Sequence, residues 1–363
     1  MPAELCLNAF QRARKLVRAR NFGEAFDAGG KMEEQIPAKP TLWEETSMKR
    51  FTLAAAVMTA VIGIGTAAQA VECKPSKWGK DDQIGAANYV TPEQVLMATK
   101  LVKKGESHPL GIVVDPNMPS FPPRGMMLQI VQPGQQSGRF RTEFGWNIVY
   151  NDDVAQLWWG TGPQIDGLGH LGEEDMYYNC NMGVDFADIS GLKALGVHNI
   201  PPMIGRGVMI DMAKHRGKTV LDAGESFGPD DIKAAAKAQG VEIRQGDIVL
   251  FHTGWTDSML ASDPKAWVSG EPGIDNAAAV YLARQNVMAV GADTWGVDVV
   301  PPKKGDKVFY GHVTLLKENG IYILETMNTG RLAKEGVNEF MFVLGQARVK
   351  GTVQMIINPV AMW

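Results

Sequence analysis

The sequence predicts an α/β fold, in which a single domain holds a central mixed β-sheet flanked by helices. Short apolar runs alternate with helical segments after residue 200, a pattern typical of strands joined by helices. Strand-like runs also follow one another without a helix between them, at 146–159 and at 340–359, which favours a mixed over a purely parallel sheet. The 363 residues, 45% of them hydrophobic, are enough for a substantial core.

Two segments precede this domain. A basic start at Met48 leads into an apolar run, and the small residues at 68–70 are typical of a signal cleavage site. We therefore expect a signal peptide at 48–70, a mature domain at 71–363, and a non-native or disordered extension at 1–47. The alternatives are a membrane anchor for the apolar run and a genuine amphipathic segment for the extension.

A signal peptide predicts a periplasmic or secreted protein with no stable membrane anchor. After residue 70 only Cys73 and Cys180 remain, and in an oxidising compartment they either form a disulfide or stay as two buried thiols. Their spacing leaves both possibilities open. The net charge of -4 and the lack of a basic stripe with interleaved aromatics argue against nucleic acid as a partner, so we expect a small-molecule substrate.

The first elements of the domain lie between residues 91 and 159. Thr91-Pro92-Glu93 is a typical helix start, and Lys103-Lys104-Gly105 ends the predicted helix. Residues 108–114 predict a strand. Residues 115–145 are rich in Pro, Gly and Met and predict a long loop, either a lid or a surface segment. A strand pair is predicted at 146–150 and 154–159, with Trp158 packed in the core.

The later elements alternate more regularly. Helices are predicted at 229–239, 276–285, 311–319 and 332–336. Strands are predicted at 207–212, 247–252, 288–293, 321–325, 340–344 and 353–359.

The stretch Gly160-Thr-Gly-Pro-Gln-Ile-Asp-Gly-Leu-Gly-His170 brings an amide, a carboxylate and an imidazole together. Gln164 and Asp166 are two residues apart, so on an extended strand they point to the same side. The surrounding glycines let the backbone turn sharply and approach a ligand. Oxygen and nitrogen ligands with a nearby proton carrier, here His170, are the residue types of a hydrolytic metal site.

Other polar residues end apolar strands, where α/β proteins often place their chemistry. They are His252, Asp293 and Glu325, and His312 stands at the start of a predicted helix. A helix followed by an adjacent returning strand can bring His312 level with Glu325. Together with Asp166 and Gln164, His312 and Glu325 would complete a nitrogen and oxygen shell for one divalent metal ion, Zn or Mn. The structural alternatives are a helix cap or ion pair for Asp293 and a loop hydrogen bond for His252.

These motifs resemble the metal-dependent cyclase hydrolases, a superfamily that includes kynurenine formamidase and isatin hydrolase. The resemblance runs from about residue 78 to residue 363. It implies a cyclase or swivelling β/α/β-like fold and a homo-oligomer, either a dimer or a tetramer. The segments that carry it are Trp78–Asn88, Gly160–His170, Phe251–Trp255, Gly291–Thr294, His312–Glu325 and the C-terminal strands from Glu339.

The superfamily signature is His-x-Gly-Thr-His-x-Asp-x-x-x-His. In this chain its first His falls on Gly160, its Thr on Pro163 and its second His on Gln164, whereas Asp166 and His170 match. In the family, the two early histidines and the Asp hold one metal.

The same Asp, a later His and a Glu hold a second metal in the family. The resemblance therefore implies at most one metal here, bound by Asp166, His312 and Glu325, with Gln164 as a weak ligand. It also implies that His170 is catalytic.

We expect a hydrolase of a small amide, formamide, cyclic amide or lactone, which attacks non-peptide C–N bonds with His170 as general acid and base. Gln164 would hold the developing oxyanion. The residues expected to contact the substrate are Trp159, Tyr177, Tyr178, His252 and Asp293. The alternatives are a catalytically inactive, exported small-molecule binding protein and a metal-free hydrolase that uses Asp166 and His170.

Overall fold

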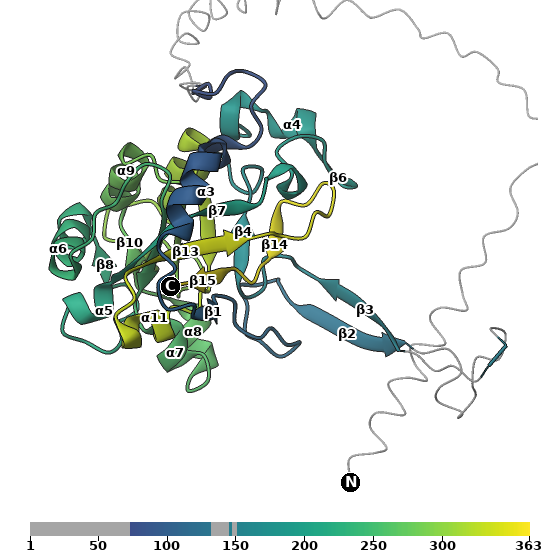
Figure 1. The fold of residues 1–363 in the computed structure, drawn as a ribbon. Coiled ribbons are helices and arrows are strands. Elements are labelled where there is room, and N and C mark those ends of the chain that lie inside the picture. Colours follow the sequence, from purple (N-terminus) through teal and green to yellow (C-terminus); the bar gives the residue numbers. More distant parts are fainter. Residues whose placement is uncertain (1–72, 132–144, 147–150) are drawn as a thin grey trace, which may run out of the picture. The chain divides into compact units, whose positions relative to one another are not determined.

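The computed structural model describes residues 73–131, 145–146 and 151–363 (Figure 1). The expected signal peptide at 48–70, the extension at 1–47 and most of the strand at 146–150 lie outside the described residues and stay predictions. Within the described part of the chain, no helix has the length and apolarity needed to cross a membrane.

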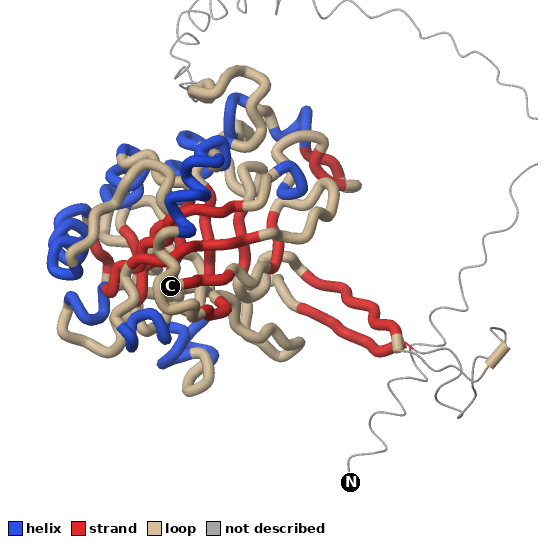
Figure 2. Tube along the Cα trace, in the orientation of Figure 1, coloured by secondary structure: helices blue, strands red, loops and turns tan. Residues whose placement is uncertain are grey.

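A mixed β-sheet forms the centre of the domain (Figure 2). The strand order is β1-β15-β13-β7-β9-β11-β12-β4-β14. The strands β7, β9, β11 and β12 run parallel, and the strands on both sides of them pair antiparallel. The mixed sheet predicted from the sequence is therefore confirmed. The bounds are β1 Ser107–Pro109, β4 Gln164–Asp166, β7 Met203–Asp211, β9 Ile248–His252, β11 Ala289–Ala292, β12 Tyr322–Glu325, β13 Glu339–Leu344, β14 Gln354–Ile356 and β15 Val360–Met362.

Helices flank this sheet (Figure 1). Every residue of β9, β11 and β12 is buried, as expected for parallel strands that are covered on both faces. The α-helices are α3 Pro92–Thr99, α4 Gly183–Phe186, α5 Met212–His215, α6 Pro229–Gln239, α7 Trp255–Met259, α8 Pro264–Ser269, α9 Asn276–Arg284, α10 Tyr310–His312 and α11 Gly330–Glu335. The remaining helical segments are η1 Gly85–Tyr89, η4 Tyr178–Cys180, η5 Val197–Asn199 and η6 Val313–Glu318.

Local chemistry explains the helix boundaries. Thr91 caps α3 by accepting a hydrogen bond from the Gln94 N–H, and Pro92 occupies the first helical position. Gly240 ends α6 with φ of +71°, a left-handed conformation that costs glycine little. Helix α3 ends at Thr99, before the predicted Lys103-Lys104-Gly105 stop.

Two predictions about strands are wrong. The segment 115–145 is not a continuous loop, because β2 (Met126–Val131) pairs antiparallel with β3 (Asp152–Leu157). The predicted strand 353–359 is too long, because β14 ends at Ile356 and the next strand, β15, begins only at Val360, far from β14 in the sheet order. In both cases the local sequence is compatible with a strand, but residues far away in the sequence decide which strand it pairs with. The remaining short pairs are β5 Ala187–Asp188 with β6 Gly191–Leu192, and β8 Ser226–Phe227 with β10 Gly273–Ile274.

The two cysteines among the described residues form a disulfide. Cys73 and Cys180 have a Cα–Cα distance of 5.2 Å, which fits the usual range for a bridge. Beside it, the Asn179 side chain accepts a hydrogen bond from the Ser76 N–H and donates to backbone carbonyls in the segment 79–82. The N-terminal segment is thus tied to η4, and the alternative of two free thiols does not apply.

Candidate metal centre

Strand register places four polar side chains on one face of the sheet. Strand β4 lies between β12 and β14, and Glu325 is opposite Gln164 while Gln354 is opposite Asp166. Directly opposed residues share a face, and so do residues two apart on one strand. All four side chains are buried. Two carboxylates and two amides are therefore held within the sheet by the backbone ladder.

His312 enters the same place from α10. Its Nδ1 lies 2.6 Å from Oδ2 of Asp298, and the other Asp298 oxygen accepts the Gly311 N–H at 2.9 Å. A Cβ at Gly311 would lie 2.2 Å from that carboxylate, so glycine is required at this position. The contact favours a proton on Nδ1 and turns Nε2 toward the other carboxylates of the site. A carboxylate that holds a histidine in this way is the usual support for a metal ligand.

Three potential ligand atoms then meet at this point. His312 Nε2 lies 3.2 Å from Glu325 Oε1 and 3.6 Å from Asp166 Oδ2. The ligand atoms of these three residues, Asp166, His312 and Glu325, all lie within 4.8 Å of one another, and we call these residues the triad. Asp166 Oδ2 is buried and has no hydrogen-bond partner. Such an orphaned oxygen is costly unless a cation or proton satisfies it. One imidazole and two carboxylates are a ligand set that fits a divalent metal ion.

The same clustering shifts the pKa values of the triad. Burial lowers the pKa of His312, but its contacts with Asp166, Asp298 and Glu325 outweigh burial and raise it well above the usual range. Burial and the neighbouring Asp166 raise the pKa of Glu325. Asp166 moves the other way, because the two histidines and the Gln354 amide outweigh its burial and lower its pKa. The raised pKa favours a second proton on His312, at Nε2, and a metal ion would replace that proton.

The two glutamines brace the carboxylates. The Gln164 amide donates to Asp166 Oδ1 at 3.2 Å and makes a shorter contact with Glu325 Oε2. Gln354 also donates to Asp166 Oδ1, at 2.7 Å. In this arrangement Gln164 turns its nitrogen toward the two ligands, away from the role of a metal-binding oxygen. Gln354 plays a comparable part, and nothing in the local sequence around it suggested that it belongs to the site.

His170 lies at the wall of a cavity next to the triad. Its Nε2 is 3.9 Å from Asp166 Oδ2 and 3.4 Å from the Gln354 amide nitrogen. Burial lowers the pKa of His170, so its ring is neutral near pH 7 and can accept a proton. The cavity has a volume of about 220 Å³. Its lining residues are Phe121, Arg124, His170, Leu171, Trp295, Gly296, Phe309, His312 and Glu325.

The predicted aromatic contacts lie elsewhere. The Tyr178 hydroxyl donates to Asp82, and Tyr177 packs edge-on against Phe186 with ring centroids 5.1 Å apart. Trp159 packs against the main core. None of the three is among the described residues that line the cavity. The aromatic wall comes from Phe121, Trp295 and Phe309, and the one signal for it was the position of Trp295, three residues after the end of the buried strand β11.

His252 and Asp293 pair with each other instead of joining the triad. His252 Nδ1 lies 2.8 Å from the Thr329 hydroxyl and 3.4 Å from Asp293 Oδ2. The backbone N–H and the hydroxyl of Thr253 both donate to Asp293 Oδ1. The cluster ties together the ends of β9 and β11.

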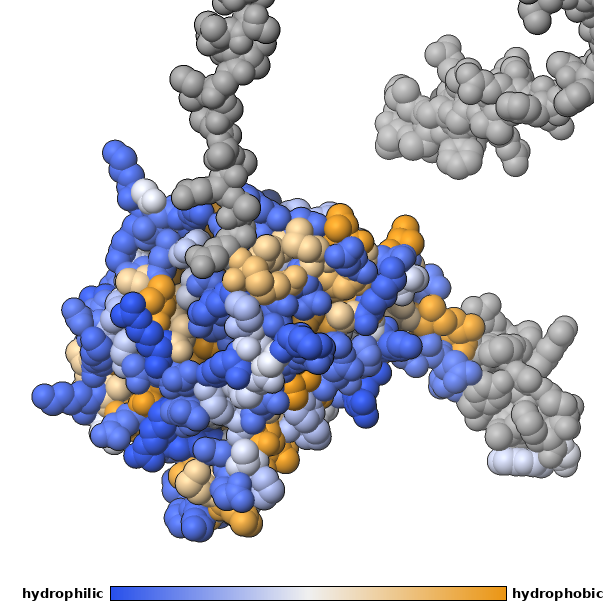
Figure 3. Space-filling view, turned by 90° about the horizontal axis from the view of Figure 1, so that it is seen from above, coloured by the Kyte–Doolittle hydropathy of each residue, from blue (hydrophilic) through white to orange (hydrophobic). Residues whose placement is uncertain are grey.

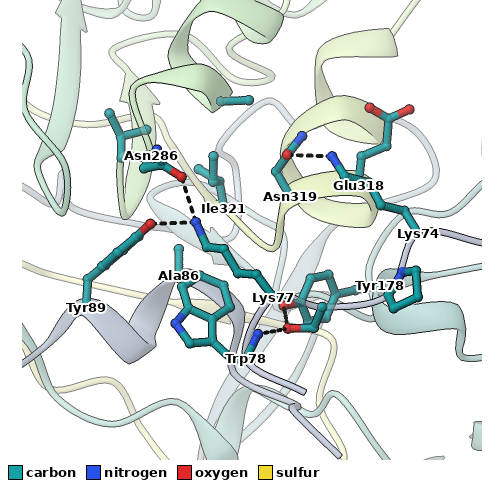
Figure 4. A pocket seen from close by; sticks show the side chains of 14 residues that line it. Lys74, Lys77, Trp78, Ala86, Tyr89, Tyr178, Asn286, Glu318, Asn319 and Ile321 are labelled. Atoms are coloured by element: carbon teal, nitrogen blue, oxygen red, sulfur yellow. Dashed lines mark hydrogen bonds between the residues drawn. The ribbon is translucent and has the colours of Figure 1, made fainter. Parts of the chain in front are cut away.

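A second cavity, of about 80 Å³, lies beside the N-terminal segment (Figure 4). Lys77 points into it and donates to the Tyr89 hydroxyl and the Asn286 side chain, while Lys74 donates to Asn319. Both lysine ammonium groups therefore already donate to side chains of the protein itself. This cavity shares no lining residue with the one beside the triad, and none of its lining residues belongs to the metal-ligand cluster found among the described residues.

Comparison with known proteins assigns the family. The chain belongs to the cyclase family, described as "Putative cyclase", whose sequence pattern matches residues 107–299. A crystal structure of a novel cyclase is 29% identical and superposes with a TM-score of 0.71, covering 79% of this chain and 98% of its own. No protein of curated function matches the sequence.

Isatin hydrolases share the fold at lower identity. Isatin hydrolase A from Labrenzia aggregata, bound to benzyl benzoate, is 18% identical with a TM-score of 0.51, covering 73% of this chain and 95% of its own. An isatin hydrolase bound to the product analogue thioisatinate is 19% identical with a TM-score of 0.53, covering 75% of this chain and 98% of its own. The resemblance inferred from the motifs is confirmed at the level of family and fold.

Proposed function

We propose that this protein is a metal-dependent hydrolase that opens a cyclic amide or cleaves a related small amide, formamide or lactone. The observation that carries the proposal is the buried acceptor triad, with its orphaned Asp166 oxygen, next to His170 at the wall of a cavity. Membership of the cyclase family and the shared fold with isatin hydrolases support a cyclic amide as the substrate class.

The residues divide the chemistry between them. A divalent ion held by Asp166, His312 and Glu325 would polarise a carbonyl and make nearby water more acidic. Neutral His170 accepts the proton of the attacking water and returns it to the leaving nitrogen or oxygen. The Gln354 amide nitrogen lies 3.4 Å from His170 Nε2 and keeps Nε2 oriented as the proton acceptor. The aromatic wall excludes water and holds a flat ring.

The rival is an inactive binding protein, which would use the cavity without the chemistry. To separate the two, the purified chain is incubated with a panel of cyclic amides, lactones and aryl formamides, both metal-loaded and after chelation. We expect turnover of at least one ring amide that disappears with chelation and returns with metal. Binding without turnover across the panel would favour the inactive protein.

His170→Gln sharpens this test. Because the variant loses the proton acceptor but none of the three ligands, we expect it to keep its metal and to lose roughly 10²–10⁴-fold in kcat. Metal content and single-turnover rates measure the two effects separately. Unchanged turnover would remove His170 from the mechanism.

We also propose that the protein is exported and forms a homo-oligomer with copies of itself. The Cys73–Cys180 disulfide supports an oxidising compartment. The β2–β3 hairpin projects from the main body (Figure 1), and Figure 3 shows hydrophobic side chains on this arm, where Leu128 and Ile130, two residues apart on one face, are exposed. Ile130→Asp should lower the oligomeric state seen by light scattering, whereas the neighbouring Gln129→Asp should not. An unchanged mass for Ile130→Asp would contradict an interface at the hairpin.

A further inference from the structure

Gly160 stands where the superfamily signature has its first histidine, and the structure shows what fills that space. A Cβ at Gly160 would lie 2.6 Å from Gln354 Oε1 and 2.8 Å from Arg124 Nη1. The same Arg124 nitrogen donates to the Gly160 carbonyl at 2.8 Å. A side chain at 160 and the present positions of Arg124 and Gln354 are therefore mutually exclusive. A guanidinium and an amide occupy the volume that an imidazole ligand would need.

Arg124 also faces the cavity beside the triad. It lines the same space as His170 and Glu325, and its charge acts on both. A short turn fixes its backbone, because the Arg124 N–H donates to the Phe121 carbonyl at 2.9 Å and the Ser120 hydroxyl donates to the Arg124 carbonyl at 2.7 Å. One turn thus delivers both a cation and an aromatic ring to the cavity.

The aromatic wall around this charge is held in place. Phe121 stacks on Trp295 with ring centroids 5.5 Å apart and an interplanar angle of 28°. Phe309 meets Trp295 and His312 edge-on. The Trp295 N–H donates to Glu271, and its ring nitrogen donates to the Trp267 carbonyl at 2.8 Å. The rings therefore form a preorganised flat-sided space.

We infer that Arg124 is the anion-recognition residue of this cavity and that the substrate is a flat ring bearing a carboxylate next to the bond to be hydrolysed. A guanidinium stays charged at every relevant pH and pairs with a carboxylate through two parallel N–H donors. Beside the rings of Trp295 and Phe309, such a pair is stronger than at a fully open surface. About 220 Å³ suits a small ring. The part of this inference that concerns hydrolysis rests on the proposed function, whereas anion recognition by Arg124 does not.

The test measures binding by calorimetry with benzoate, benzamide and phthalamate, which is a benzamide with a carboxylate beside the amide. Each is titrated into the metal-loaded and the chelated protein, because a metal ion could itself bind a carboxylate. We expect phthalamate to bind more tightly than benzamide in both forms. Arg124→Met should remove this preference, a loss of roughly 10- to 100-fold in affinity for the anion. Arg124→Lys should lose less, because it keeps the charge without the paired donors.

Controls separate this inference from the proposed function. Arg216→Met removes a guanidinium that pairs with Asp231 on another part of the protein, and it should leave the phthalamate preference intact. Metal affinity and Tm of each variant show that the site and the fold persist. A preference that survives in Arg124→Met, or an effect on benzoate alone, would overturn the inference. If the preference depends on Arg124 but no ring amide is hydrolysed, anion recognition stands and the proposed hydrolase fails.

Discussion

Two histidine–aspartate pairs lie at the carboxyl ends of the parallel strands, and only one of them belongs to the candidate metal site. In the His312–Asp298 pair, Nδ1 is held by the aspartate and Nε2 faces two further carboxylates. In the His252–Asp293 pair, the surroundings are the hydroxyls of Thr253 and Thr329 and a backbone N–H. Hydroxyls can donate protons, whereas carboxylates cannot. A histidine therefore becomes part of a cation site only where a second and third acceptor converge on its free nitrogen.

The largest expected difference between the two pairs is in metal content. His312→Ala removes the only nitrogen ligand of the triad, so we expect the purified variant to lose nearly all bound metal. His252→Ala removes a side chain that bonds to Thr329 and Asp293, and it should keep a full complement. Elemental analysis after dialysis measures both. Equal metal content in the two variants would contradict the claim that only the His312–Asp298 pair belongs to the metal site.

The next largest effect concerns the aspartates. Asp298→Asn removes the negative charge and one of the two acceptor oxygens that hold His312 and Gly311, so we expect metal affinity to fall about 10- to 100-fold. Asp293→Asn leaves the triad untouched but weakens a buried hydrogen-bond cluster, which should cost about 1–3 kcal/mol in the free energy of unfolding. Metal titration and urea denaturation separate these outcomes. A loss of metal affinity in Asp293→Asn would mean that the two clusters are coupled.

A smaller effect is expected from pH. Burial and Asp166 raise the pKa of Glu325 to about 8, and contacts with acids raise that of His312. Raised pKa values stabilise the metal-free fold at low pH, and this stability is lost as pH rises through them. Metal ions must displace the same protons, so metal affinity should rise as pH rises through the pKa of Glu325, about 8. The gap in Tm between metal-loaded and chelated protein should therefore widen from about pH 5 to pH 8, by differential scanning fluorimetry. His312→Ala should show no such widening.

The smallest effect tests the packing around position 160. Gly160→Ala places a methyl group against Gln354 and Arg124, so we expect a loss of about 1–3 kcal/mol in stability from overpacking. Gly345→Ala, where a Cβ meets nothing within 4 Å, is the matched control and should be nearly neutral. Urea midpoints report both. A neutral Gly160→Ala would show that the guanidinium and amide move aside easily.

The sequence alone determined the local features. The Pro-capped helix at 229–239, the buried strand from Ile248 and the pairing of Gln164 with Asp166 on one strand face all follow from neighbours within a few residues. The motifs also placed Asp166, His312 and Glu325 in one set. Short-range patterns are reliable here because helix caps, period and strand alternation are properties of the local backbone.

Only the tertiary structure decided which residues from distant parts of the sequence meet at the site. Gln354 and Arg124 reach the site from strand register and from a turn within a segment expected to be a loop, and neither carries a local signature. Trp158, expected in the core, is 48% exposed, while Trp295 closes the cavity. Burial and contact between distant segments depend on which strands pair and which loops meet. Sequence spacing does not encode these pairings, and they separate the His312 cluster from the His252 cluster.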